Sequence, residues 1–340
     1  MTSRILPAMK TPLSIALGLL VSGIPLAADS TPPPAVLRRE ALAAGGRGEA
    51  GLPVLEKAMQ SKEALVRRAA VRSLAEIGPP AAERLRQCAT DDPDPLVRRT
   101  ALRAISRQQA PAQRLPVLEA GIRDADEMVR LDAVEALALL KEEPQAAALL
   151  QKASEDRSRA VSQAAIEALW PFHGEVVSAR MRPEFQDLQL GVATRIDLPA
   201  KGWKFRVDPP MRGHLEGWHL PDFDDHDWGE GAIGRTWQSF GHQYEGVAWY
   251  RLSLDLPEEP KGVATDLVFE GVDQSAWVWI NGEYLGAHDI GLRGYDLPFA
   301  IDCGRVLKWG RRNRIVVRVS KPSGTHGGIW KPVYFEVLTR

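Results

Sequence analysis

The sequence predicts a multidomain protein of the α plus β class, with a short α-solenoid followed by an antiparallel β-sandwich. Two observations lead to this prediction. A valine recurs at nearly constant spacing, at Val66, Val97, Val129 and Val161, and the repeat stops after Trp170. All seven histidines and nine of the ten tryptophans lie beyond that point. The chain therefore divides into two regions of different construction.

The recurring valines lie in related phrases that indicate a helical repeat. Examples are ALVRRAAVRSLAEIG from Ala64 and EMVRLDAVEALALL from Glu127. Apolar residues fall at helical spacing within each phrase, and a second helical pattern containing a leucine precedes each of three of the four valines. A helical hairpin of this kind cannot bury its apolar face alone, so stacked neighbours must share a core. The pattern resembles short HEAT-like repeats over residues 35–172.

Charge and cysteine content narrow the function. The formal net charge is −1, which gives no reason to invoke nucleic acid or an anionic membrane. The arginine pairs Arg67-Arg68 and Arg98-Arg99 alternate with acidic residues, so we expect a solvated helix face. Cys88 and Cys303 fall in different regions, which favours free buried thiols over a disulfide or a metal site.

The segment 1–28 has the layout of a secretory signal peptide. Basic residues precede an apolar stretch from Leu13 to Leu26, and Ala27 and Ala28 follow it. The stretch is short for a membrane span, so we expect cleavage rather than a retained anchor. Residues 29–34 then form a proline-rich lead, and the mature protein is expected to be exported to the periplasm or the extracellular space.

The second region reads as β-structure. Runs such as RLSLDL from Arg251, AWVWING from Ala276 and RIVVRVS from Arg314 alternate or are rich in β-branched residues, and Gly, Pro, Asn and Asp separate them. Asn281-Gly282 predicts a two-residue hairpin, because both central positions of such a turn favour a positive φ. We expect a connection over residues 173–194 and a sandwich over residues 195–340.

The order of these phrases resembles a known domain. FDDHDW from Phe223, EGVAWYRLSLDLP from Glu245, LVFEGVDQSAWVWINGEYLGAH from Leu267, GYDLPFAID from Gly294 and HGGIWKPVYFEV from His326 occur in sequence. This series is similar to the amino-terminal sugar-binding domain of glycoside hydrolase family two, the β-galactosidase and β-glucuronidase group. The resemblance implies a galactose-binding-like jelly roll and does not extend to the helical repeats or the connection.

Carbohydrate binding requires aromatic faces and fixed polar groups on loops that a rigid sandwich holds in place. Three loops supply them, at residues 237–245, 288–295 and 321–330. The residues expected to bind carbohydrate are Trp237, His242, Gln243, Tyr244, Arg293, Tyr295, His326 and Trp330. Trp228 and Trp249 are instead expected in the core.

Catalysis is not expected. Retaining hydrolysis needs two facing carboxyl groups, which the resemblance places on a barrel domain after the jelly roll, whereas this sequence ends at Arg340 just after its last predicted strand. Some relatives add a carboxylate or amide from the loop before the GGI phrase, and here that loop has Pro322, Ser323 and Gly324. We therefore expect no catalytic residues, although a truncated hydrolase or an accessory role in carbohydrate metabolism stays open.

No cofactor or metal is required by the sequence. The acidic run Asp222, Asp224, Asp225, His226 and Asp227 could hold a structural Ca²⁺, or serve turns and helix caps. The leading hypothesis is an exported, non-catalytic protein whose jelly roll binds a glycan or polysaccharide and whose solenoid docks a protein partner. The alternative is a structural adaptor without sugar affinity.

Overall fold

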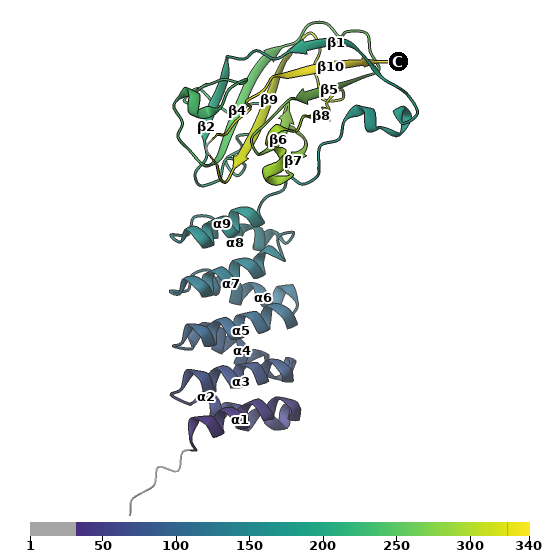
Figure 1. Ribbon diagram of the computed structural model, residues 1–340. Helices are drawn as coiled ribbons and strands as arrows, with labels where there is room; N and C mark the ends of the chain where they lie inside the picture. Colours follow the sequence, from purple (N-terminus) through teal and green to yellow (C-terminus); the bar gives the residue numbers. More distant parts are fainter. Residues whose placement is uncertain (1–31, 325) are drawn as a thin grey trace, which may run out of the picture.

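The computed structural model describes residues 32–324 and 326–340 of the chain, which form a helical stack with a β domain at its carboxyl end (Figure 1). The expected signal segment, residues 1–28, and the first residues of the proline-rich lead lie outside these described residues. Within the described part, no helix is long and apolar enough to cross a membrane. The amino-terminal helix lies at the end of the stack farthest from the β domain.

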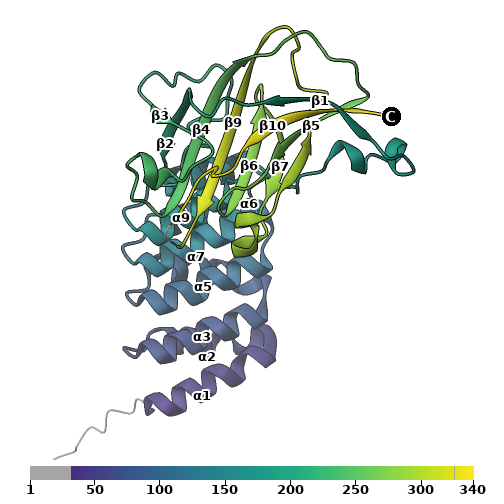
Figure 2. The same ribbon diagram turned by 45° about the horizontal axis from the view of Figure 1, so that its top comes forward.

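The stack consists of paired helices, as the repeat pattern predicts (Figure 2). The helices are α1 Pro34–Ala44, α2 Leu52–Met59, α3 Ala64–Ile77, α4 Ala82–Asp91, α5 Pro95–Gln108, α6 Pro111–Gly121, α7 Glu127–Ala138, α8 Pro144–Ala153 and α9 Arg159–Ala168, with short 3-10 turns at Gly45–Gly51 and Pro79–Ala81. One layer is built by α3, α5, α7 and α9 in succession, and α4, α6 and α8 form the second. The solenoid prediction is confirmed.

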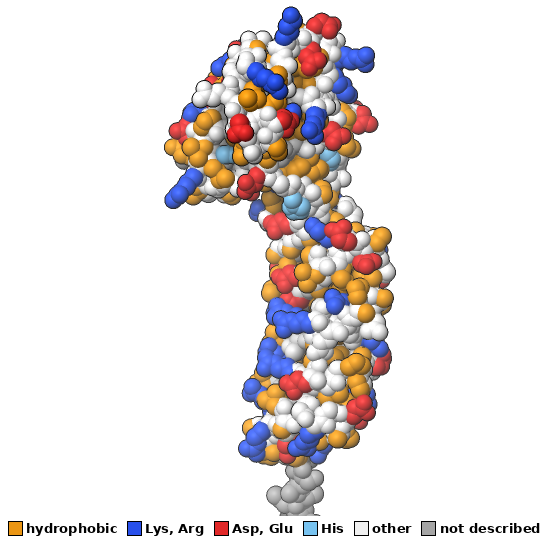
Figure 3. All heavy atoms as spheres, turned by 90° about the vertical axis from the view of Figure 1, so that its right-hand side faces the viewer, with side chains coloured by type: hydrophobic (Ala, Val, Ile, Leu, Met, Phe, Trp, Pro, Cys, Tyr) orange, Lys and Arg blue, Asp and Glu red, His pale blue; other side chains and the backbone are white. Residues whose placement is uncertain are grey.

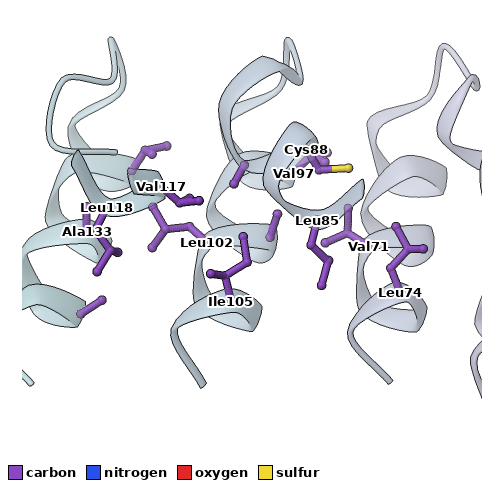
Figure 4. Packing of buried hydrophobic residues seen from close by; sticks show 14 of the residues in the cluster. Val71, Leu74, Leu85, Cys88, Val97, Leu102, Ile105, Val117, Leu118 and Ala133 are labelled. Carbon is purple, nitrogen blue, oxygen red and sulfur yellow. The ribbon is translucent and has the colours of Figure 1, made fainter. Parts of the chain in front are cut away.

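The recurring valines form the centre of the solenoid core. Each is no more than 1% exposed, and leucine and alanine side chains from both layers surround them. Figure 4 shows Val71, Leu85 and Leu102 pointing into the space between successive repeats. Small residues allow neighbouring helices to pack closely. At Gly121, for example, an added Cβ would lie only 2.8 Å from the side chains of Ala133 and Leu102. The apolar stripe of each helix is thus buried by the next repeat.

Arginine–aspartate pairs join the repeats, which corrects one sequence expectation. Arg67 and Arg98 were expected on a solvated face, but their side chains are only 11% and 12% exposed. Arg67 bonds Asp92, and Arg98 bonds Asp124 through two hydrogen bonds of 2.7 Å. Each aspartate lies in the loop of the following repeat. The near-constant period of the repeats brings each of these arginines to the next aspartate, so their side chains connect repeats rather than face water.

Two antiparallel sheets form the β domain. The strands are β1 Gly191–Asp197, β2 Trp203–Val207, β3 Gly229–Gly231, β4 Gly246–Asp255, β5 Ala264–Phe269, β6 Ser275–Ile280, β7 Glu283–His288, β8 Phe299–Asp302, β9 Arg312–Lys321 and β10 Val333–Thr339. Their order is β1-β10-β5-β8 in one sheet and β3-β2-β4-β9-β6-β7 in the other. β1 begins at Gly191, slightly before the expected start of the sandwich, because the extra residues pair with β10.

The main β core lies between the two sheets. Tyr250 and Leu252 of β4 point into it, as the alternation predicts. The opposite face of the six-stranded sheet is also apolar, and there Trp249, Trp279 and Trp228 form a second cluster. Trp228 and Trp249 are 4% and 0% exposed, which confirms their core assignment. The predicted hairpin joins β6 to β7, with φ of 53° at Asn281 and 89° at Gly282.

The connection between the domains is ordered against the β domain. Val176 N–H donates to Ala287 of β7 (3.0 Å), and Ala287 N–H donates to Gly174 (2.9 Å). Farther on, Arg182 binds Asp302 through two hydrogen bonds of 2.6 Å. On the solenoid side, Arg212 Nη1 donates to the carbonyl oxygen of Ser154 (2.7 Å) after α8. These contacts fix the β domain on the last repeat.

Candidate functional site

A cleft of about 570 Å³ opens in the β domain where three segments meet beside Thr236, which lies between β3 and β4. One segment joins β5 to β6, another is the 3-10 turn Gly291–Asp296 between β7 and β8, and the third joins β9 to β10. The lining residues are Thr236, Asp273, Gln274, Leu292, Tyr295, Ser323, Gly324, His326 and Trp330. Two of the three predicted loops therefore converge, and Tyr295, His326 and Trp330 lie in one cleft.

Both aromatic side chains of the cleft are accessible, and that of Trp330 is held in place. Tyr295 is 52% exposed. Trp330 is partly exposed, and its Nε1 donates to the carbonyl oxygen of Tyr295 (2.8 Å). The Lys331 ammonium group lies 4.5 Å from the centroid of the Trp330 ring and pairs with Asp296. The indole therefore has a fixed orientation, with part of its surface open to the cleft.

Polar groups enter the cleft from positions that the sheet fixes. The backbone of Asp273 pairs with Gly328, its N–H donating to the Gly328 carbonyl at 3.0 Å. Gln274 is 5% exposed, and its Nε2 donates to the carbonyl oxygen of Ser323 (2.8 Å). Partial burial raises the pKa of the Asp273 carboxyl group, while the charges of Lys321 and His326 oppose that rise. The cleft thus offers a carboxylate, an amide and an imidazole beside two aromatic rings.

Trp237 does not line the cleft, which corrects the expectation that it contacts a ligand. Its side chain is fully buried in the main β core, and its Nε1 donates to the carbonyl oxygen of Tyr244 (3.1 Å). The indole packs so closely on Gly327 that no Cβ fits at that position. The aromatic ring therefore supports the backbone of the HGGI phrase from beneath, and its burial excludes contact with a ligand.

The remaining predicted residues lie outside the cleft. His242 packs on Phe205, with ring centroids 4.6 Å apart, and burial lowers the pKa of its imidazole. Gln243 is exposed beside it. Tyr244 accepts a hydrogen bond from the Val247 N–H (3.3 Å) and lines a separate hollow between the two domains. Arg293 is exposed on the 3-10 turn. The loop at 237–245 thus contributes to packing and to the domain junction.

Sequence reasoning missed Asp273 and Gln274 as site residues. The available signal was their position, because they directly precede β6 in the phrase EGVDQSAWVWING, and strand ends are common places for binding groups. The pairing of Asp273 with Gly328 joins two phrases that are distant in the chain, so it could not be read from either phrase alone.

The acidic run before β3 is engaged by arginines. The Asp225 carboxylate accepts from Arg251 Nε (2.8 Å) and Arg314 Nη1 (3.0 Å), and Asp227 accepts from Arg206. Asp224 accepts from the backbone N–H of His226, as in a turn. Among residues 32–324 and 326–340, no three His, Cys, Asp or Glu side chains are placed so that they could hold one metal ion together. Turns and ion pairs therefore account for these carboxylates.

Comparisons with known families agree with this two-part architecture. Residues 25–106 and 82–170 match HEAT repeats, and residues 214–321 match the β-galactosidase second all-beta domain. The chain joins HEAT repeats to a β domain related to glycoside hydrolase family two. The domain matched by residues 214–321 is the second all-beta domain of β-galactosidase. The phrases quoted from the sequence instead resemble the amino-terminal sugar-binding domain of glycoside hydrolase family two.

The relatives of this family-two-related domain are much longer proteins. A β-glucuronidase of Formosa agariphila is 33% identical over 115 residues, covering 28% of this chain and 11% of the relative. A β-galactosidase of Thermoanaerobacter pseudethanolicus is 30% identical over 137 residues, covering 34% and 18%. Among solved structures, a Ruminococcus gnavus β-glucuronidase is 21% identical with a TM-score of 0.37, covering 43% of this chain and 29% of that one. The chain thus spans less than a fifth of the length of these two curated relatives.

Proposed function

We propose that this chain is a non-catalytic carbohydrate-binding protein whose β domain holds a glycan in the cleft at Tyr295 and Trp330. The observation that carries this proposal is the meeting of two accessible aromatic side chains with Asp273, Gln274 and His326. Aromatic faces cover the C–H surfaces of a pyranose, while a few fixed polar groups bind its hydroxyls. The support is strongest at Trp330, because its orientation is set before any ligand arrives.

The carboxylate content of the cleft supports binding without hydrolysis. Among the described residues that line it, Asp273 alone carries a carboxyl group. Retaining and inverting glycosidases both need a pair of carboxyl groups across the scissile bond. We therefore propose that the related domain serves here to hold a glycan.

We further propose that the solenoid docks a protein partner. The residue before three of the recurring valines is apolar and exposed: Leu65 is 56%, Leu96 is 47% and Met128 is 42% exposed. These three positions recur with the repeat, so they follow one another along the stack. Basic, acidic and apolar side chains alternate over the solenoid face in Figure 3, which agrees with a surface that lacks a single strong charge. A periodic apolar row of this kind suits a protein surface.

Export is part of the proposal and depends on the apolar segment from Leu13 to Leu26, outside the described residues. An exported glycan-binding protein would meet polysaccharide outside the cytoplasm. Mass determination of the protein recovered from the periplasm or medium of the producing cell tests this step. Cleavage near Ala28 is the expected result, and an intact amino terminus in the cytoplasm would contradict it.

A glycan array with the full chain tests the binding proposal. We expect specific retention of a glycan by the wild-type protein, and its loss in Trp330→Ala and Tyr295→Ala. Leu188→Ala is a matched control, because Leu188 is 42% exposed on the connection and outside the cleft. If the folded wild-type protein retains no glycan, the adaptor alternative replaces this function. Replacing Leu65, Leu96 and Met128 by alanine should then abolish binding of the protein partner to the solenoid.

A further inference from the structure

A second cleft, of about 560 Å³, lies at the junction of the solenoid and the β domain. Trp170, just after α9, and residues 172–176 of the connection form one side. Trp277 of β6 and residues 287–290 form the other side. The narrowing between the domains is visible in the space-filling view (Figure 3). Trp170 at the end of the repeat region thus lines this cleft together with the connection and the β domain, and we define it as the junction cleft.

Its two tryptophans form a fixed pair. Their ring centroids are 5.8 Å apart in an edge-to-face arrangement, and Trp170 Nε1 donates to the Phe172 carbonyl oxygen (2.7 Å). The Arg318 guanidinium lies 4.6 Å from the centroid of Trp170 and 4.4 Å from that of Trp277. Such cation–π contacts strengthen where the cation is desolvated, and Arg318 is only 8% exposed. Arg318 comes from the central strand β9, so it positions both indoles on a rigid support.

The Arg318 guanidinium lies against both rings and also interacts electrostatically with the carboxylates of Asp208 and Asp289. Arg318 Nε is buried and has no hydrogen-bond partner among the described residues. A buried polar atom of this kind is unusual and calls for an explanation. The two aromatic contacts supply one, since they hold the cation while both tryptophans stay partly exposed to the junction cleft. The arrangement resembles a preorganised aromatic platform, because the rings need not be ordered when a ligand binds.

The polar groups of the junction cleft are acidic and imidazole side chains. Asp289 is exposed, and its carboxylate accepts from Ser275 Oγ (2.6 Å). Glu175 is exposed on a backbone segment that pairs with Ala287 of β7. Neither Lys nor Arg occurs among the described residues that line this cleft or the cleft at Trp330. Carboxylates accept hydrogen bonds from sugar hydroxyls and repel anionic groups, which favours a neutral glycan.

The two clefts are neighbours. Ile290 lines the junction cleft, and Leu292 lines the cleft at Trp330. The same relation holds at the start of β6, where Gln274 lines one cleft and the adjacent Ser275 holds Asp289 of the other. Along the chain only Gly291 lies between these two lining residues, and we call residues 290–292 the ridge. A linear ligand passing over this ridge would reach both.

We propose that the junction cleft is a second subsite for a neutral glycan, so that the end of the solenoid takes part in sugar binding through Trp170. This inference rests on the proposed function of the first cleft. It predicts that the protein prefers a neutral oligosaccharide long enough to cross the ridge over a short one. It also gives a physical reason for the rigid attachment of the β domain to the last repeat.

Calorimetric titration of the full chain with a series of neutral oligosaccharides, from disaccharide to hexasaccharide, tests the subsite. The sugar type is the one retained on the array. Trp277→Ala should weaken hexasaccharide binding roughly tenfold and leave disaccharide binding unchanged. Trp330→Ala should weaken both. Trp170→Phe keeps an aromatic ring and should retain most of the affinity, whereas Trp170→Ala should behave like Trp277→Ala.

The outcomes separate the two proposals. If Trp330→Ala weakens binding but Trp277→Ala and Trp170→Ala, shown to be folded by their melting curves, bind the hexasaccharide normally, the subsite is wrong and the first cleft stands. If the wild-type protein binds neither a member of the neutral series nor the matching oligouronates, the proposed function itself fails. If the matching oligouronate binds more tightly than the neutral oligosaccharide of the same length, only the preference for a neutral glycan is wrong.

Discussion

Arg98 donates two hydrogen bonds to Asp124 of the following repeat, through Nε and Nη2, each at 2.7 Å. The same relation joins Arg67 to Asp92 and Arg130 to Asp156. The aspartates also accept from the backbone of their own loop, as Asp124 does from Asp126 N–H (2.8 Å). Each aspartate therefore orders its loop and binds the preceding repeat.

We predict that Asp124→Asn lowers the free energy of unfolding by about 2–4 kcal/mol, because it leaves the Arg98 guanidinium partly buried without its counter-charge. Chemical denaturation followed by circular dichroism measures this change. Glu119→Gln is the matched control, since it breaks the exposed pair with Arg123 and should cost no more than about 0.5 kcal/mol. Equal effects of the two substitutions would contradict the role of the Arg–Asp pairs.

The junction should lose stability as the pH falls from about 6.5 to about 4. His214 lies 4.7 Å from the Trp170 ring, between ring centroids, and neither of its nitrogens has a hydrogen-bond partner among the described residues. Burial, followed by the charge of Arg318, lowers the pKa of His214 to about 4 from the ordinary 6.5.

Between these pH values His214 is protonated in the unfolded chain but not in the folded state. The free energy of unfolding therefore decreases, by up to about 3 kcal/mol, as the pH is lowered through this range. Thermal unfolding across the pH range should show this slope in the wild-type protein and a flatter one in His214→Phe. His226→Ala, at an exposed histidine, should keep the wild-type slope. If the thermal stability of His214→Phe depends on pH as that of the wild-type protein does, His214 is not the group responsible.

Glycan affinity should also fall as the pH is lowered. Because burial raises the pKa of the Asp273 carboxyl group, protonation begins at a pH above the usual aspartate range. The ionised form accepts hydrogen bonds from sugar hydroxyls, and the protonated form loses part of this capacity. Asp273→Asn should weaken binding by about tenfold and remove the acid-side decline. Titration calorimetry at several pH values measures both effects, with Asp197→Asn on β1 as the control.

Arg212 should control how firmly the β domain is attached to the solenoid. Its Nη1 donates to the carbonyl and hydroxyl oxygens of Ser154, at 2.7 and 2.8 Å. We expect Arg212→Ala to increase proteolytic cleavage between residues 169 and 178 by roughly tenfold or more, because a charged hydrogen-bonded contact is lost. Arg312→Ala, which breaks an exposed pair with Asp255, should leave the cleavage rate unchanged. Indistinguishable digestion of Arg212→Ala and wild type would contradict this attachment.

The solenoid could be predicted from the sequence because its signal is periodic. Val66 and Val97 occupy equivalent places in adjacent repeats, so their burial follows from spacing alone. The burial of Arg67 could not be predicted in this way, since its partner Asp92 is distant in the chain and is ordered by the next repeat. Local alternation of charge looks the same on a solvated face and in an inter-repeat pair.

The site could be predicted only in part, for a related reason. The sequence predicts that Tyr295 and Trp330 lie on loops as binding residues, and the sheet order brings the two together. Trp237 has the same local signature, but Gly327 packs directly against its ring and places it in the core. Trp170 belongs to the repeat region, and its contact with Arg318 depends on how the two domains meet. Pairings between distant segments decide each of these cases.

Glycan-array binding by the full chain, measured beside Trp330→Ala, shows most directly whether the cleft at Trp330 holds a glycan. We expect the wild-type protein to retain a neutral glycan and the folded variant to lose it. Retention that is unchanged in Trp330→Ala, or no retention by a folded wild-type protein, would contradict it.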